Sequence, residues 1–189
     1  MRIGLLGGSF NPAHAGHRLI STIALKRLQL DYIWWLITPG NPLKDNSSLP
    51  SQARRMFDAQ KIANHPRIKM TGFESQINTR YTYDTVRYLK QRFKKVKFVW
   101  IMGADNLSQF HHWQNWQNLA NMMPIAVIDR PKSTLLSTHS RAAFRLNKYK
   151  IKEAKASCLA GLKAPAWVFL HGTRTNMSST VLRKHRQQD

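Results

Sequence analysis

The amino-acid sequence predicts an α/β protein with a doubly wound parallel sheet and helices on both faces. Six short apolar, β-prone segments alternate with segments whose apolar residues recur at helical spacing. Glycine, acidic and basic residues follow directly after several of these apolar segments. Those positions are the carboxyl ends of the expected strands, where open α/β sheets of the Rossmann-like kind bind their ligands.

Length and composition favour one domain with a substantial core, spanning residues 1–189. The chain has 189 residues, of which 42% are hydrophobic. No apolar run approaches the roughly 20 residues that span a bilayer, and the N-terminus is typical of a core strand instead of a signal peptide. The single cysteine, Cys158, excludes an internal disulfide framework and fits a reducing compartment. We therefore expect a cytoplasmic protein with no membrane partner.

The formal net charge of +21 raises the question of nucleic-acid binding. Basic residues are spread along the chain, with the densest clusters at 90–97, 148–155 and 183–186. No recognised nucleic-acid module is visible, so we do not expect nucleic acid as a partner. A small polyanionic substrate accounts for part of the excess, and the rest has no physical explanation in the sequence.

The first strand, expected over residues 2–6, leads into a glycine loop, Gly7-Gly8-Ser9-Phe10-Asn11-Pro12-Ala13-His14-Ala15-Gly16-His17, and then into a helix. Backbone N–H groups in such a loop and the positive end of the helix dipole favour phosphate. The glycines let the backbone approach a ligand closely. His14 and His17 lie on one face of the first helical turn, where they suit stabilisation of negative charge during phosphoryl or nucleotidyl transfer.

This loop does not match the two best-known phosphate loops. G-x-x-x-x-G-K-[ST] is absent, which excludes a Walker-type loop, and the glycines do not fit G-x-G-x-x-G, which weakens a dinucleotide-oxidoreductase interpretation. A plain tight turn with two incidental histidines is one alternative. A His-x-x-His metal site is another, although no carboxylate or cysteine cluster lies nearby in the sequence.

The next elements follow the same order of strand, loop and helix. A strand is expected over 32–37, and Lys44 in the following loop is either a phosphate ligand or an ordinary solvated lysine. Ser51 is expected to cap a helix over 51–64, and a short strand follows over 67–71. Thr82 is expected to cap a helix that ends at Phe93, with Asp84 complementing its dipole.

Ligand-type residues also follow the fourth and fifth strands, expected over 96–102 and 125–128. Gly103 and Asp105 end the fourth; Asp105 is suited to accept ribose hydroxyls, to hold a magnesium-bound water or to cap a helix. Trp113 and Trp116 either pack in the core or stack on a planar ring. Arg130 after the fifth strand suits a phosphate. The basic region 132–164 is expected to contain only a weak helix, over 138–147. A sixth strand is expected over 166–170.

The last motif, over residues 176–183, predicts a second anion site. Ser178 is expected to cap a helix, and the hydroxyl groups and N–H groups of its first turn suit an anion. Arg183 lies about one turn further along and is able to point back at the same anion. A simple helix cap is the alternative.

The loop sequence Gly-Gly-Ser-Phe-Asn-Pro-x-His-x-Gly-His resembles the signature of the nucleotidyltransferase superfamily with the H-x-G-H motif, with Asn11 where Asp is commoner. Nearly the whole chain resembles the bacterial nicotinate mononucleotide adenylyltransferases of that superfamily. The matching segments are Pro-x-Asn-Pro-x-Lys ending at Lys44, Glu74 with Arg80, Tyr81, Thr82, Asp84 and Thr85, Gly-Ala-Asp-Asn-Leu with Trp113 and Trp116, and Ser-Ser-Thr-x-Leu-Arg ending at Arg183.

The resemblance implies transfer of AMP from ATP to nicotinate mononucleotide, giving nicotinate adenine dinucleotide and pyrophosphate in NAD biosynthesis. The mononucleotide phosphate attacks the α-phosphorus directly, and Mg²⁺ is bound mainly through the ATP phosphates, with no metal site of the protein's own. The implied catalytic residues are His14, His17 and Arg183. The implied ATP site comprises Gly7, Gly8, Ser9, Phe10, His14, His17, Gly103, Asp105, Ser178, Ser179, Thr180 and Arg183. The implied mononucleotide site comprises Lys44, Thr82, Trp113 and Arg130.

Two rival functions stay open on the sequence alone. One is a nucleic-acid-binding protein built on a phosphate-binding fold, which the net charge favours. The other is an adenylyltransferase that uses nicotinamide mononucleotide or another phosphate acceptor. The sequence does not determine the oligomeric state.

Overall fold

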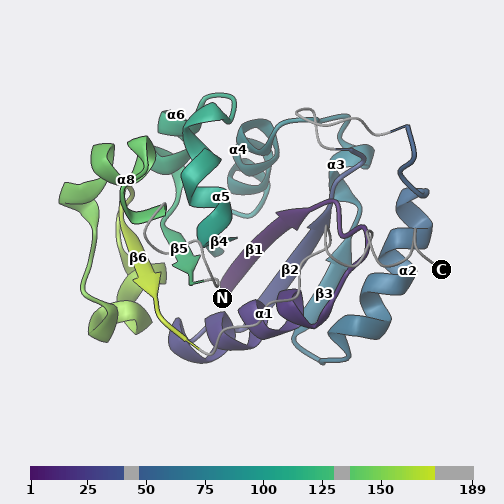
Figure 1. Cartoon of the computed structure of the whole chain (residues 1–189), viewed down its shortest axis with the longest axis horizontal. Coiled ribbons are helices and arrows are strands. Elements are labelled where there is room, and N and C mark those ends of the chain that lie inside the picture. Colours follow the sequence, from purple (N-terminus) through teal and green to yellow (C-terminus); the bar gives the residue numbers. More distant parts are fainter. Residues whose placement is uncertain (41–46, 130–136, 173–189) are drawn as a thin grey trace.

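Six parallel strands in the order β3-β2-β1-β4-β5-β6 form the central sheet of the computed structural model, which describes residues 1–40, 47–129 and 137–172 (Figure 1). The predicted parallel α/β sheet is therefore confirmed, and each of the six predicted strands is present. The strands are β1 Arg2–Gly8, β2 Tyr32–Ile37, β3 Ile68–Thr71, β4 Lys97–Gly103, β5 Ile125–Ile128 and β6 Trp167–Leu170.

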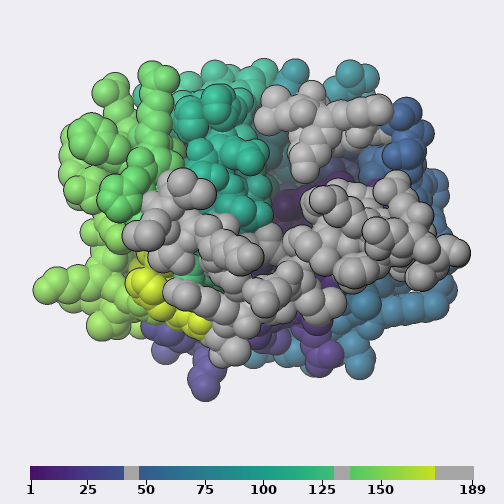
Figure 2. Space-filling view, viewed as in Figure 1, coloured from purple at the N-terminus to yellow at the C-terminus, as the bar shows by residue number. Residues whose placement is uncertain are grey.

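The strand order reverses at β1, which pairs with β2 on one side and with β4 on the other. Gly8 is opposite Ile37 of β2, and Leu6 is opposite Ile101 of β4. The loops that follow β1, β2 and β4 therefore start from neighbouring positions at the carboxyl edge of the sheet. Open α/β sheets bind ligands at such a switch point. In Figure 2, purple atoms from the start of the chain lie recessed between blue and teal segments.

Side chains of all the strands except β3 alternate between two separate cores, one on each face of the sheet. In β5, for example, Ala126 and Ile128 belong to one core, and Ile125 and Val127 belong to the other. Because both faces are covered, β2 is a continuous apolar run, as the sequence predicted. The helices that supply buried residues to the first core are α1 Ala15–Arg27, α2 Gln52–Ala63 and the 3₁₀ segment η3 Glu153–Gly161.

The opposite face carries α4, α5, α6 and α8, so α1 and the α4–α6 group lie on opposite sides of the sheet (Figure 1). These helices are α4 Thr82–Arg92, α5 Ala104–Gln109, α6 Trp116–Met122 and α8 Arg141–Arg145. The short elements α3 Phe73–Gln76, η1 Phe110–His112 and η2 Asn147–Tyr149 connect the larger ones.

The predicted helix caps are confirmed at one helix and wrong at another. The hydroxyl of Ser51 accepts the backbone N–H of Arg54 at 3.3 Å, so Ser51 is the N-cap of α2, as expected. Thr82, in contrast, is the first residue of α4, and Tyr81 is the N-cap. The reason is that the Tyr81 carbonyl already accepts the backbone N–H of Thr85 at 3.2 Å, which places the helix start one residue earlier.

The basic region contains more structure than the sequence predicted. The weak helix expected over 138–147 includes only the short α8, whose N-cap Ser140 accepts the N–H of Ala143 at 3.2 Å. The longer η3 was not expected, because its apolar residues do not follow one helical stripe. No helix among the residues of the described ranges is both long and apolar enough to cross a membrane.

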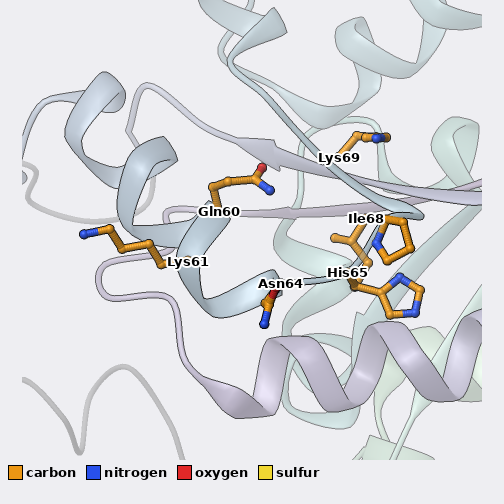
Figure 3. Close-up of a pocket in the computed structure, with 7 residues that line it drawn as sticks. Gln60, Lys61, Asn64, His65, Ile68 and Lys69 are labelled. Atoms are coloured by element: carbon orange, nitrogen blue, oxygen red, sulfur yellow. The ribbon is translucent and has the colours of Figure 1, made fainter.

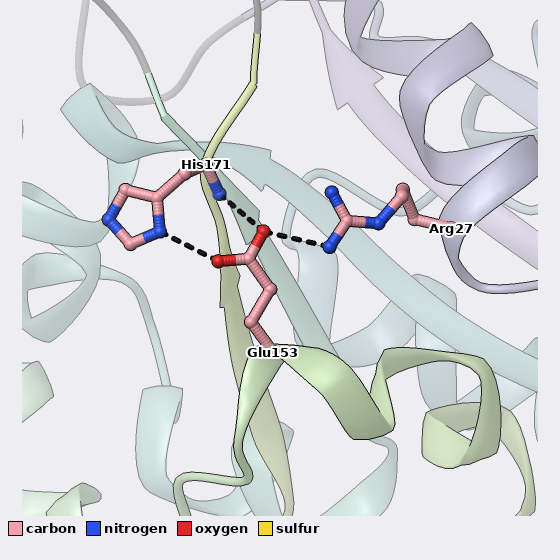
Figure 4. A network of polar contacts seen from close by, with 3 residues as sticks. All are labelled: Arg27, Glu153 and His171. Carbon is pink, nitrogen blue, oxygen red and sulfur yellow. Dashed lines mark hydrogen bonds and ion pairs between the residues drawn. The ribbon is translucent and has the colours of Figure 1, made fainter.

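Glu153, at the start of η3, joins α1 to the end of β6 (Figure 4). Its carboxylate accepts the Arg27 guanidinium at 2.9 Å and the backbone N–H and Nδ1 of His171 at 3.0 and 2.8 Å. Partial burial acts to raise the pKa of Glu153, but the hydrogen bonds from His171 and Arg27 outweigh it and hold that pKa below its usual value. This contact fixes the position from which the chain leaves the sheet toward residues 173–189.

Candidate active site

His14 and His17 cap the N-terminus of α1 through their ring nitrogens. His14 is the N-cap residue, and its Nδ1 accepts the backbone N–H of Gly16 at 3.1 Å. Nδ1 of His17 in turn accepts the backbone N–H of His14 at 3.2 Å. This is a capping box in which histidines replace the usual hydroxyl and carboxyl side chains.

The capping box defines which ring nitrogen carries the proton in each imidazole. Because both Nδ1 atoms accept backbone N–H groups, the proton of each neutral ring is on Nε2. The ring centroids of His14 and His17 lie 3.9 Å apart, so the two donors belong to one locus. His14 is almost fully buried, with 2% of its surface exposed, whereas His17 is half-buried. Both rings lie at the positive end of the α1 dipole.

Aromatic packing beneath the loop holds His17 in place. Phe10 stacks on Trp35 with a centroid distance of 4.8 Å and contacts the His17 ring at 4.7 Å. Nε1 of Trp35 donates to the Ser21 hydroxyl, which donates to the carbonyl of His17, each at 2.8 Å. Phe10 has a positive φ of 48°, a conformation that a bulky residue adopts only when its surroundings enforce it.

The two adjacent glycines of the loop differ in how much space a side chain would have. A Cβ at Gly7 would lie 2.8 Å from the buried ring of Trp100, so a side chain there would displace the core. A Cβ at Gly8 would lie 3.5 Å from Phe10, an ordinary contact. The absence of a side chain at Gly7 is therefore explained by packing against β4, without a ligand.

Arg55 of α2 is a buried residue that the sequence interpretation did not single out. It is 3% exposed and donates to backbone carbonyls of separate segments: Nη1 to Ser9 at 2.6 Å and to Thr38 at 2.8 Å, and Nη2 to Pro39 at 3.1 Å. Its Nε donates to Pro50 at 2.9 Å. Burial lowers the pKa of the guanidinium below its ordinary value, although an arginine stays charged in such a site.

One sequence signal for Arg55 exists. It precedes the buried alanines Ala59 and Ala63 by one and two helical turns, so it lies on the stripe of α2 that faces the core. A charged residue on an otherwise apolar stripe indicates either that the predicted buried face of the helix is wrong or that the charge belongs to a buried polar network. For Arg55 the structure shows a buried polar network.

A second buried network, formed by Glu74, Thr79 and Thr85, lies at the start of α4. The carboxyl of Glu74 is 3% exposed and accepts the Thr85 hydroxyl at 3.0 Å, and that hydroxyl lies 3.1 Å from the hydroxyl of Thr79. Burial raises the pKa of Glu74 to about 7, with a partly opposing effect of the hydrogen bond from Thr85. Its Oε2 has no hydrogen-bond partner among the described residues. Thr82 is the first residue of α4, three residues before Thr85, and is half-buried.

The end of β4 places Gly103 as the N-cap of α5 and Asp105 in the first turn of that helix. The alternative in which Asp105 itself is the cap is therefore wrong, because Gly103 has the extended N-cap conformation. Trp113 is half-buried and packs edge-on against Trp100, with centroids 5.9 Å apart. Trp116 packs against Phe110 at 5.7 Å and contributes to the core, as one of the two sequence interpretations proposed.

The structure brings part of the predicted site together. The segments with His14 and His17 and with Gly103 and Asp105 follow the carboxyl ends of the adjacent strands β1 and β4. The remaining predicted site residues lie outside the described ranges. They are Lys44, Arg130, Ser178, Ser179, Thr180 and Arg183.

An open pocket of the described surface lies at the opposite edge of the sheet (Figure 3). It is formed where α2 ends and β3 begins, so it belongs to the amino ends of the strands. None of the predicted site residues lines it. The labelled lining residues are Gln60, Lys61, Asn64, His65, Ile68 and Lys69.

A family model and full-length relatives place this chain in the same family of nucleotidyltransferases. The model of the cytidylyltransferase-like family matches residues 5–185. A Bradyrhizobium sp. (strain ORS 278) protein named "Probable nicotinate-nucleotide adenylyltransferase" is 57% identical, over 97% of this chain and 95% of its own length. A protein of the same name from Methylorubrum extorquens (strain PA1) is 54% identical, over 97% of this chain and 99% of its own.

A solved structure shares the fold. The Plasmodium falciparum nicotinic acid mononucleotide adenylyltransferase complexed with NaAD superposes with a TM-score of 0.72 at 19% sequence identity, covering 97% of this chain and 82% of that one. The family follows from the match of the family model over most of the sequence and from the full-length relatives above. This chain belongs to the cytidylyltransferase-like family and, within it, to the nicotinate-nucleotide adenylyltransferases.

Proposed function

We propose that this chain transfers AMP from ATP to nicotinate mononucleotide, forming nicotinate adenine dinucleotide and pyrophosphate in NAD biosynthesis. The observation that carries the proposal is the histidine capping box at the start of α1, with its two Nε2–H donors beyond the carboxyl end of β1. Family membership supports the choice of substrates.

In this reaction a phosphate oxygen of the mononucleotide attacks the α-phosphorus of ATP. A new oxygen–phosphorus bond forms while the bond between the α-phosphorus and the bridging oxygen breaks, and pyrophosphate leaves with the electron pair. The protein needs no covalent nucleophile, so catalysis is alignment and stabilisation of charge. His14 and His17 donate from Nε2 to ATP phosphates, where negative charge develops in the transition state.

The two substrates are proposed to meet at the switch point beside β1. Thr82 and Trp113 from the α4 and β4 side are proposed to contact the pyridine nucleotide, together with Lys44 and Arg130. Arg183 is proposed as a third catalytic residue, on a helix beginning near residue 178 that completes the ATP site within a single domain. The proposed ATP ligands are Gly7, Gly8, Ser9, Phe10, His14, His17, Gly103, Asp105, Ser178, Ser179, Thr180 and Arg183.

The metal is proposed to be Mg²⁺, which neutralises phosphate charge when bound. Among the described residues, no group of three or more His, Cys, Asp or Glu side chains gathers as a metal site. We propose that the ion is held mainly by substrate phosphates and waters, with Asp105 as the side chain that would accept a magnesium-bound water. The single exposed cysteine, Cys158, is compatible with the reducing cytoplasm that we propose as its location.

The test is pyrophosphate release with ATP and either nicotinate or nicotinamide mononucleotide. We expect turnover with the acid to exceed turnover with the amide. We also expect His17→Ala to lower turnover by about two orders of magnitude or more, as loss of one transition-state donor does. Lys26→Ala, at the exposed far end of α1, is the matched control and keeps wild-type turnover. Preference for the amide would refute the substrate assignment, and near-normal turnover of folded His17→Ala would refute the role of the capping box.

A further inference from the structure

Arg55 joins two loops that are far apart in the chain. Its Nη1 donates to the carbonyl of Ser9 in the loop after β1 and to the carbonyl of Thr38 after β2, and its Nη2 donates to Pro39. The backbone N–H of Thr38 also donates to the carbonyl of Gly8 at 3.0 Å. The loop after β1 and the turn at 38–40 therefore share one guanidinium.

The chemistry of this contact requires an arginine. The acceptors to which Arg55 donates among the described residues are all backbone carbonyls, and the arginine is 3% exposed. A planar fork of N–H donors reaches several carbonyls in different directions at once. Lysine carries three donors on one nitrogen atom and cannot span the same acceptors, so Arg55→Lys keeps the charge and removes the bridge.

Arg55 also determines where neighbouring N–H groups point. In a trans peptide unit the C=O and the following N–H point in opposite directions. The contact with the Ser9 carbonyl therefore turns the N–H of Phe10 away from Arg55, and the contact with Pro39 does the same for the N–H of Gly40. Phe10 has the positive φ of 48° that must be enforced by its surroundings, and Arg55 supplies part of that constraint.

We propose that Arg55 is a positioning residue that holds the loop after β1 and the turn at 38–40 in one arrangement, so that the sites for both substrates are formed together. This inference rests on the proposed function for its kinetic consequences, and on geometry alone for its structural ones. Loss of the bridge is expected to affect both substrates, although Arg55 contacts neither.

The experiment compares Arg55→Lys with Arg54→Lys on the same helix. Arg54 is the matched control, because its side chain is 67% exposed and its described partner is Asp58 on the next turn. Well below the melting temperature of each variant, Arg55→Lys should raise KM for ATP and for the mononucleotide by about tenfold each and lower kcat, as lost charge-assisted hydrogen bonds do. Arg54→Lys should leave all three parameters unchanged.

Amide hydrogen exchange provides a readout that does not depend on substrates. In Arg55→Lys, exchange should accelerate at the backbone amides of Thr38, His14 and Gly16. In the wild type, the Thr38 amide proton is hydrogen-bonded to the carbonyl of Gly8, and those of His14 and Gly16 are hydrogen-bonded to histidine Nδ1 atoms. Faster exchange in both loops supports the inference even if the wild-type enzyme proves inactive with these substrates, an outcome that would refute only the proposed function. Faster exchange in one loop or neither, or a lower melting temperature with unchanged KM and kcat, would overturn the inference.

Discussion

The backbone N–H of His14 donates to Nδ1 of His17 at 3.2 Å, so one side chain of the proposed catalytic pair completes the helix cap of the other. Each imidazole therefore uses Nδ1 for the helix cap, and under the proposed function its Nε2–H donates to an ATP phosphate. We therefore expect substitutions of these histidines to affect stability through the loss of Nδ1 and turnover through the loss of Nε2, as two separate effects.

Replacement of His14 is the first test of this division. Asparagine is among the strongest N-cap residues, so His14→Asn should preserve the free energy of unfolding while lowering turnover by about two orders of magnitude. His14→Ala should lose a similar factor in turnover and also about 1 kcal/mol of stability. Urea unfolding and pyrophosphate release measure the two effects. Equal stability of the two variants would show that the ring of His14 does not cap α1.

The adjacent glycines give a second test, based on stability. Gly7→Ala should lower the free energy of unfolding by about 1–3 kcal/mol, because its Cβ would press on the Trp100 ring at 2.8 Å. Gly8→Ala should cost less than about 1 kcal/mol, because it meets an ordinary contact and needs no positive φ. Urea unfolding compares them, and an equal loss in both variants would contradict the packing explanation.

Glu74 predicts a pH dependence of stability. Its pKa of about 7 in the folded protein lies above the ordinary value of 4.5, so the folded state binds more protons between these two pH values. The contribution of Glu74 to the free energy of unfolding should therefore be largest below about pH 4.5 and fall by up to about 3 kcal/mol as the pH rises through 7.

Glu74→Gln removes this titration and keeps an oxygen to accept the Thr85 hydroxyl. Urea unfolding of the wild type and of Glu74→Gln from pH 5 to 8.5 should show that the variant loses less stability as the pH rises. Parallel curves for the two proteins would mean that Glu74 is ionised in the folded state throughout this range.

Glu153 predicts the opposite dependence. Its pKa is held below 4.5 by Arg27 and His171, so its contribution to stability is present above that value and is lost as the pH falls through the lowered pKa. Because both partners are more than one-third exposed, the effect should be about 1 kcal/mol. Between pH 5 and 3, urea unfolding should show a smaller loss for Glu153→Gln than for the wild type, and an identical loss would contradict the assignment.

The sequence by itself determined the sheet and the position of the first loop. Strands such as β4 and β5 are continuous apolar runs that lie buried on both faces, and a local pattern is enough to predict such an element. The same holds for Ser51, because an N-cap acts on its own helix. The pair His14 and His17 was also visible, since helical spacing places both rings at one helix start.

Only the tertiary structure decided the residues that support the loops. Arg55 acts on carbonyls 46, 17 and 16 positions away, and Glu74 acts on a hydroxyl 11 positions away. The packing of Gly7 against Trp100 likewise depends on a neighbour that the fold brings close. A buried polar group is defined by its partners, and those partners come together only when the sheet and its helices have packed.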